Sequence, residues 1–383
     1  MTCIRRGCSR NTDARLAAAE LYAAIAQPEM ALVLFFCSCR YDLEVLGAEL
    51  NRLFGETPLM GCTTAGEIGP SGLSDDMLVG ASFSAKEFFA ISGGVGDLKE
   101  FDRSKGHTLC QGLLQRLWLQ DRFSVAQHSF AILLVDGLSL REEIVARSIQ
   151  DVLSEIPLVG GSASCQPESC VTKIYADGHF QSDLATLTLV TTNLPFRVDK
   201  AQHFTPTEER VVITEADPSR RIVYEINGRP AAEEYARLLG AQASGLTTEL
   251  IARSPLAVLL NGSVYVRGVQ RVNADGSLTF FCAIERGVVL RLAHSGDLIG
   301  NLQAVFDEIR SDIGRPLATI GFDCMLRRME IEQEKLEDSV AALLVDNNAI
   351  GFCTFGEQYY GTHINQTFVC IAIGEPQREA RHG

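Results

Sequence analysis

Two stretches of this sequence, Gly61-Cys-Thr-Thr-Ala-Gly-Glu67 and Gly351-Phe-Cys-Thr-Phe-Gly-Glu357, share the pattern G-x-x-T-x-G-E. Before the first stretch, residues 31–36 form an apolar run with the length of a buried strand. Residues 42–54 then show helical periodicity, and Gly55 stands where a glycine commonly ends a helix. We predict that the shared phrase ends a repeated βαβ-like unit.

A second and a third copy of this unit follow the same order of strand, helix and glycine-containing strand end. The second copy comprises a strand over 128–135, a helix over 141–154 and Pro157-Leu-Val-Gly160, which matches Pro58-Leu-Met-Gly61. The third comprises a strand over 318–322 and one long helix over 324–344, before the second G-x-x-T-x-G-E phrase. The sequence therefore predicts three related units in one chain.

Strand-rich segments separate the copies, with hairpin turns predicted at Asp177-Gly178 and at 273–276. The fold class expected is α/β (α+β mixed), with repeated βαβ-like units, mixed sheets and a two-part architecture. Asn11 or Thr12 is expected to cap a first helix that ends near Ala26. The predicted parts are an N-terminal helical region 1–29, a first domain 30–217, a second domain 218–374 and a tail 375–383.

Composition narrows the functional classes. The 383 residues carry a net charge of -14, which argues against nucleic acid or an anionic membrane as a partner. No apolar run is long enough to span a bilayer, and the stretch 1–16 lacks the apolar core of a secretion signal, so we expect a cytoplasmic protein. The twelve cysteines lack metal-site spacing; most are expected in the core, and a redox pair of Cys165 and Cys170 remains open.

Three phrases together resemble the FIST family of sensory proteins, which combine an N-terminal and a C-terminal FIST domain. They are Gly61 to Glu67, Gly160-Gly-Ser-Ala163 and the segment from Gly356 to Thr367. The resemblance implies that 30–217 and 218–374 correspond to these two domains. It also implies a ligand-binding signalling protein, without catalytic activity.

Two further stretches, Gln202-His-Phe204 and 272–284, resemble the NosP branch of this family, whose members sense nitric oxide with a haem. That resemblance implies non-covalent haem b, nitric oxide as the ligand, and output to a separate sensor histidine kinase or cyclic-di-GMP enzyme. Whether the chain forms a homo-oligomer remains open.

Three histidines are candidates to hold the iron. His203, beside Phe204, lies in the connector between the two predicted parts, where ligand sites are common, and it is our first choice as metal ligand. His363 belongs to the family's tail phrase, and His179 follows the predicted turn at Asp177-Gly178.

An alternative function is the binding of a small, amino-acid-like metabolite without haem. Backbone N–H groups of glycine-rich strand ends bind anions, and paired carboxylates bind amines. Glu67 and Glu357 either face such a pocket or accept hydrogen bonds from the adjacent turn. A third possible function is that of a cysteine hydrolase, with Cys62, His363 and Asn365 as its catalytic residues. The residues that we expect at the ligand site are Gly61, Cys62, Thr64, Glu67, Gly160, Gly161, Ser162, Glu357 and Asn365.

Overall fold

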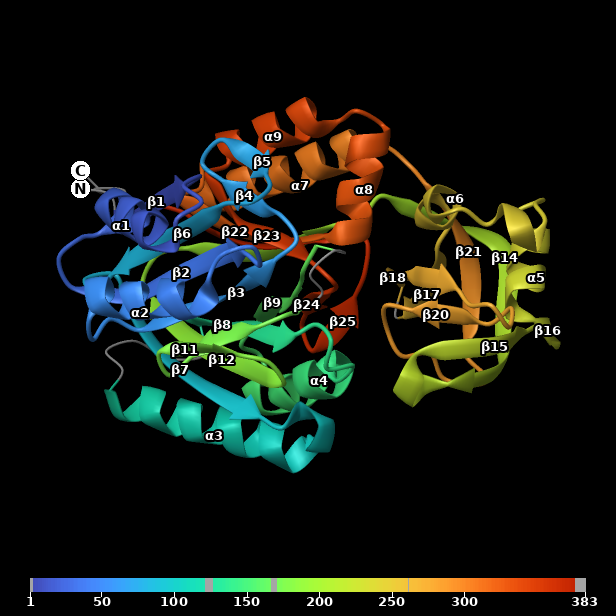
Figure 1. Ribbon diagram of the computed structural model, residues 1–383, viewed down its shortest axis with the longest axis horizontal. Helices are drawn as coiled ribbons and strands as arrows, with labels where there is room; N and C mark the ends of the chain where they lie inside the picture. Colours follow the sequence, from blue (N-terminus) through green and yellow to red (C-terminus); the bar gives the residue numbers. More distant parts are fainter. Residues whose placement is uncertain (1–2, 121–126, 167–170, 261, 376–383) are drawn as a thin grey trace, which may run out of the picture.

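The computed structural model describes residues 3–120, 127–166, 171–260 and 262–375. It has a larger body and a smaller unit beside it (Figure 1). The predicted tail after residue 375, and Cys170 of the proposed redox pair, lie outside the described residues. In the part of the chain that is described, no helix is both long and apolar enough to cross a membrane.

The three predicted βαβ copies are confirmed. In each, two parallel strands pair side by side, with the glycine of the second strand opposite Phe35, Leu133 or Gly321 of the first. The copies are β2 (Met30–Ser38), α2 (Leu43–Phe54) and β3 (Leu59–Thr64); β8 (Ser129–Asp136), α4 (Glu142–Leu153) and β9 (Leu158–Ala163); and β22 (Ala318–Cys324), α8 (Met325–Gln333), α9 (Glu337–Asp346) and β23 (Ala349–Thr354).

The structural repeat is longer than these copies. Each repeat begins with an outer strand and a helix and ends with an antiparallel strand that pairs with both the outer strand and the first parallel strand. The outer strands and helices are β1 (Ile4–Ser9) and α1 (Ala14–Ile25), β7 (Phe88–Gly96) and α3 (Arg103–Gln120), and β13 (Phe196–Ala201) and α7 (Leu298–Ile313). The closing strands are β6 (Leu78–Ser84), β12 (Leu184–Thr192) and β26 (Phe368–Ile373).

The repeats exchange hairpins in a cycle. The first repeat's hairpin extends the third repeat's sheet at β23, the second repeat's extends the first at β3, and the third repeat's extends the second at β9. These hairpins are β4 (Glu67–Gly69) with β5 (Gly72–Ser74), β10 (Ile174–Ala176) with β11 (His179–Gln181), and β24 (Glu357–Tyr359) with β25 (Thr362–Ile364). Each of the three sheets of the body thus has six strands.

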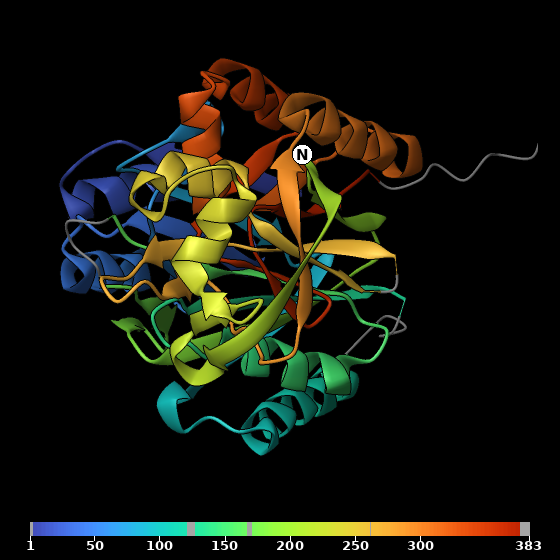
Figure 2. The same ribbon diagram turned by 90° about the vertical axis from the view of Figure 1, so that its right-hand side faces the viewer.

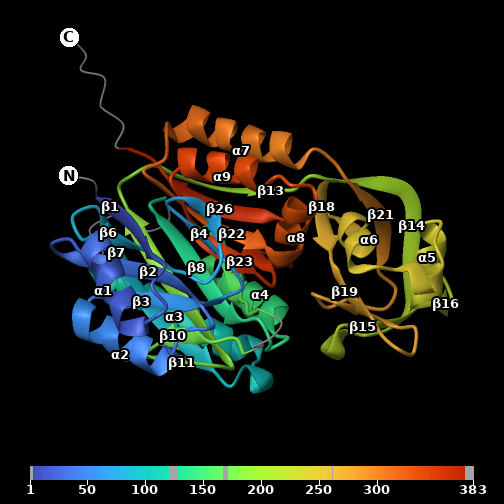
Figure 3. The same cartoon turned by 45° about the horizontal axis from the view of Figure 1, so that its top comes forward.

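One apolar core joins the three sheets, and it includes Phe36, Phe130 and Phe322 from the first strand of each copy. Helices cover the outside of each sheet in separate clusters. Figure 3 shows α7 and α9 over the third sheet. Strands that are buried on both faces consist of continuous runs of apolar residues, and such runs allowed these strands to be predicted from the sequence.

A smaller β unit, residues 204–295, interrupts the third repeat between β13 and α7. We call it the inserted unit; Figure 2 shows it in front of the body. It has its own core and one eight-stranded sheet. Its elements are β14 (Phe204–Asp217), β15 (Ile222–Ile226), β16 (Arg229–Pro230), α5 (Ala231–Leu238), α6 (Thr248–Arg253), β17 (Leu256–Leu260), β18 (Ser263–Arg267), β19 (Val269–Val272), β20 (Leu278–Phe280) and β21 (Val289–Ser295).

Several local predictions need correction. The helix expected over 324–344 is two helices, because Lys335 takes a left-handed conformation with φ of 56° between them. Asp13, not Asn11 or Thr12, caps α1 by accepting from the N–H groups of Arg15 and Leu16. The region 1–29 also contains β1, an edge strand whose charged residues concealed it. The boundary predicted near residue 217 falls within the inserted unit.

Gly351 should not accept a side chain, because a Cβ there would lie 1.8 Å from the carbonyl oxygen of Gly321 in the paired strand. We expect Gly351→Ala to lower the free energy of unfolding by about 1–3 kcal/mol or more, as overpacking does in cores. Gly112→Ala, on the exposed face of α3 where a Cβ meets nothing within 4 Å, should raise it by about 0.5–1 kcal/mol. Urea unfolding compares the two; similar effects would contradict this view of the strand pair.

Candidate functional site

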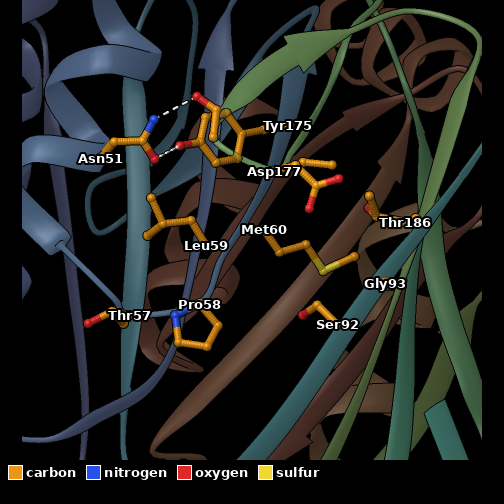
Figure 4. Close-up of a pocket in the computed structure, with 13 residues that line it drawn as sticks. Asn51, Thr57, Pro58, Leu59, Met60, Ser92, Gly93, Tyr175, Asp177 and Thr186 are labelled. Carbon is orange, nitrogen blue, oxygen red and sulfur yellow. Dashed lines mark hydrogen bonds between the residues drawn. The ribbon is translucent and has the colours of Figure 1, made fainter.

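A cavity lies at the boundary between the first and second repeats. One wall is the start of β3 together with the exchanged hairpin β10–β11, and the other is formed by β7 and β12 (Figure 4). Its volume is about 240 Å³. We call it the boundary cavity; it is lined by Asn51, Thr57, Pro58, Leu59, Met60, Ser92, Gly93, Gly94, Tyr175, Ala176, Asp177, Gly178 and Thr186.

Asn51 fixes the hairpin side of the boundary cavity. Its Nδ2 donates to the carbonyl oxygen of Gly178 at 2.6 Å, and its Oδ1 accepts from the Tyr175 hydroxyl at 2.5 Å. Burial raises the pKa of Tyr175 to about 12, so the phenol is a neutral donor at physiological pH. The turn itself needs left-handed residues, and Asp177 and Gly178 have φ of 49° and 87°. The hairpin predicted there is confirmed.

The opposite side carries hydroxyl groups on one face of β12. The Thr188 hydroxyl lies 2.8 Å from that of Ser92 and donates to the sulfur of Met60 at 3.0 Å. Thr186, two residues earlier, is 4% exposed, and its Oγ1 has no hydrogen-bond partner among the described residues. Figure 4 shows this hydroxyl facing the cavity. An unsatisfied buried hydroxyl costs stability, and a hydrogen-bond partner at this position would recover that cost.

The predicted ligand residues lie elsewhere. Gly61, Gly160 and Gly161 are inside strands, not in turns, and they allow close approach of neighbouring groups. A Cβ on Gly160 would lie 1.9 Å from the carbonyl oxygen of Leu133, and one on Gly161 would lie 2.5 Å from the Thr354 side chain. These contacts explain the glycines through packing between strands.

Glu67 and Glu357 have equivalent structural roles. Each is fully buried and accepts a hydrogen bond from the threonine three residues earlier, Thr64 or Thr354. Each also accepts from the backbone N–H ten residues later, that of Met77 at 3.0 Å or of Thr367 at 3.2 Å. Those N–H groups lie just before β6 and β26. The carboxyls therefore tie each exchanged hairpin to the strand that follows it.

In the second repeat, a different residue accepts the hydrogen bond that links the exchanged hairpin to the following strand. Gln166 occupies the position of Glu67, but Asp136, at the end of β8, accepts from the N–H of Asp183 at 2.5 Å, just before β12. Its other carboxylate oxygen accepts from the hydroxyl of Thr172. The interaction is present in all three repeats, although the phrase is complete in only two.

Cys62 is buried in the central core, and burial raises its thiol pKa well above the ordinary value. A thiol in this environment is a poor nucleophile. His363 and Asn365 instead contact the inserted unit: the Asn365 side-chain oxygen accepts from the N–H of Gly268 at 3.4 Å. The structure does not support a hydrolase site formed by Cys62, His363 and Asn365.

His363 is held on both sides of its ring. Its Nδ1 accepts from Gln358 Nε2 at 3.2 Å, and its Nε2 donates to the carbonyl oxygen of Phe281 at 3.3 Å. Gln358 also donates to the Ser162 hydroxyl at 3.1 Å. Burial lowers the pKa of His363 to about 4, so the ring is neutral. Of the predicted residues, Ser162, His363 and Asn365 thus meet where the body contacts the inserted unit.

His203 and His179 lie apart from this contact. His203 is 6% exposed, its Nε2 lies 3.0 Å from Glu330, and its ring packs on Phe204 with centroids 4.3 Å apart. Glu330 also accepts from Ser295, so one carboxylate holds both linkers of the inserted unit. His179 is exposed, and its Nδ1 lies 3.0 Å from the carbonyl oxygen of Asp177.

Sequence reasoning missed the boundary cavity and the ion pairs of the inserted unit. Arg221, 4% exposed, contacts Glu142 at 2.5 Å and Glu143 at 2.8 Å on α4. The turn at Asp177 was the one available signal for the cavity. Met60, Thr186 and Asn51 belong to elements whose proximity depends on the hairpin exchange, which the sequence does not reveal.

These features define a class of protein: a three-repeat α/β body that carries an inserted β unit. The FIST N domain model matches residues 31–229, and the FIST C domain model matches residues 231–360. The chain belongs to the FIST family of sensory domains. The two family segments meet within β16, so their boundary does not coincide with a boundary between structural repeats.

Other comparisons add little. A search of curated proteins gives no match. Among solved structures, a similar chain is described as "Cyanuric acid hydrolase: evolutionary innovation by structural concatenation". It is 10% identical, with 97% of this chain and 99% of that chain covered and a TM-score of 0.37. A likeness of this size has no bearing on activity.

Stability should fall as the pH rises through about 8, because burial raises the pKa of both Glu67 and Glu357 from 4.5 to about 8. A carboxyl whose pKa is higher in the folded than in the unfolded state contributes stability. That contribution is complete at a pH below the unfolded-state pKa and is lost as the pH rises to the folded-state pKa. Glu357→Gln, which stays neutral, should flatten this decline between about pH 5 and 9. Urea midpoints across that range measure it, with exposed Glu100→Gln as the control. An unchanged slope in Glu357→Gln would refute the assignment.

Proposed function

We propose that this protein is a sensory module that binds a small polar ligand in the boundary cavity and signals to a separate protein. The observation that carries the proposal is the Thr186 hydroxyl, which is buried, unsatisfied and directed into a cavity with hydrogen-bonded walls. The volume of about 240 Å³ suits a metabolite smaller than a drug-sized molecule. The proposal involves no catalytic step.

The position of the cavity supports a signalling role. Its walls come from two repeats, and the hairpin wall is exchanged from the second repeat onto the first. A ligand that contacts Asn51, Asp177 and Thr186 together binds best to one spacing of the two repeats. It thereby shifts the population toward that spacing, which is the requirement for a signal. From the family resemblance we further propose a sensor histidine kinase or a cyclic-di-GMP enzyme as the receiving partner.

Haem-based sensing of nitric oxide remains a prediction from the resemblance, and the three candidate histidines do not fit a haem in this arrangement. Both ring nitrogens of His363 are hydrogen-bonded, His203 is buried and paired with Glu330, and His179 is on an exposed hairpin. Absorption spectra of protein expressed with added haem test the prediction. A Soret band that shifts with nitric oxide and disappears in His203→Ala would favour haem over the boundary cavity.

Two threonine variants separate a binding role from a packing role. Thr186→Val removes an unsatisfied hydroxyl, so it should raise the free energy of unfolding by about 1 kcal/mol and abolish ligand binding. Thr188→Val, its control on the same face of β12, removes a hydroxyl bonded to Ser92 and Met60 and should lower stability by about 1 kcal/mol. Denaturant unfolding and thermal shift against a metabolite collection measure both effects. The proposal fails if no metabolite raises the melting temperature, or if every rise persists in Thr186→Val.

A further inference from the structure

We infer that the ligand of the boundary cavity is a small aliphatic amine, bound as its ammonium ion by Asp177. This inference rests on the proposed function, and it identifies the ligand class through charge, hydrogen bonding and shape of the wall. Each of these properties is contributed by different residues of the cavity.

Charge is the first property. Among the thirteen described residues of the wall, Asp177 is the one that carries a charge at neutral pH. No described residue forms an ion pair with its carboxylate, and Figure 4 shows that group directed toward the space between Met60 and Thr186. A ligand carboxylate or phosphate would find no Arg or Lys on this wall. The net charge of -14 also attracts cations and repels anions over longer distances.

The position of the carboxylate is fixed by the turn. Asp177 occupies a left-handed position with φ of 49°, its carbonyl oxygen is bonded to His179, and the next carbonyl oxygen is held by Asn51 at 2.6 Å. A carboxylate on such an anchored turn loses little conformational freedom when it binds a cation. The site is therefore preorganised on its charged side.

Hydrogen bonding and shape complete the description. The Thr186 hydroxyl supplies an acceptor for a second N–H of an ammonium group, opposite Asp177. Pro58, Leu59 and Met60 supply an apolar surface for a short alkyl chain. Among the described wall residues no other polar side chain is both buried and unsatisfied, so a ligand with many hydroxyl groups would gain fewer hydrogen bonds than it loses to water.

Three probes with the same number of carbon atoms test the charge preference: n-butylamine, 1-butanol and butyrate, which are cationic, neutral and anionic at pH 7.5. Calorimetric titration of the full chain should show butylamine binding about threefold to fivefold more tightly than butanol, as for a partly exposed ion pair, and butyrate more weakly than both. The butylamine preference should shrink in 0.5 M NaCl, because salt screens an exposed carboxylate.

Asp177→Asn is the matched variant, since asparagine accepts a left-handed turn position and removes only the charge. It should reduce the preference for butylamine over butanol to less than about twofold. Asp97→Asn is the control: Asp97 is also exposed and left-handed, with φ of 52°, but it lies outside the cavity wall. We expect Asp97→Asn to keep the full preference.

The outcomes separate this inference from the proposed function. Equal binding of the three probes, or a butylamine preference that persists in Asp177→Asn, overturns the amine assignment. If another metabolite then binds and Thr186→Val abolishes that binding, the sensory site stands with a different ligand class. Failure of every compound to bind, or binding unaffected by Thr186→Val, overturns both.

Discussion

No repeat of the body completes its own sheet, and this constraint shapes everything else in the molecule. β3, β9 and β23 each present an edge that is covered by a hairpin from another repeat. Uncovered edges of this kind pair with other chains, and an isolated hairpin is marginal in water. The buried carboxyls of Glu67, Glu357 and Asp136 hold the chain where it leaves each exchanged hairpin. The duplicated G-x-x-T-x-G-E phrase occurs where two of these exchanged hairpins begin, and its Thr and Glu side chains are hydrogen-bonded to each other.

The inserted unit is hydrogen-bonded both to the third repeat, which it interrupts, and to the second repeat. It leaves and re-enters the third repeat through linkers held by Glu330, yet Arg221 pairs with Glu142 and Glu143 of the second repeat. Burial of charge costs desolvation, so such a pair contributes little net stability, but it permits one orientation of the two surfaces. The inserted unit therefore bridges the second and third repeats.

The sequence revealed the repeated core because buried parallel strands and amphipathic helices have strong patterns. Phe35 and Leu133 lie in such strands, and both were predicted correctly. Pattern reasoning failed where long-range pairing decides the structure. For Glu67 the sequence favoured a structural role over a pocket role without deciding between them, and the hydrogen bond from the N–H of Met77 supports the structural role. The sequence did not identify Asp136 as the counterpart of Glu67, because Asp136 accepts the equivalent backbone hydrogen bond from a different position in the repeat.

The boundaries between repeats differ in the residues that line them. The boundary between the second and third repeats has a wider groove of about 650 Å³, lined in part by Pro157, the counterpart of Pro58. The backbone plan is shared, but the wall residues differ, so ligand chemistry can change without a change of fold. Within the first boundary, Thr188 has a satisfied hydroxyl and Thr186 does not, although both lie on one strand face. One strand face thus carries a hydroxyl whose hydrogen bonds are made and, on the cavity wall, a hydroxyl whose hydrogen bonds are not, and the second costs stability until a partner reaches it.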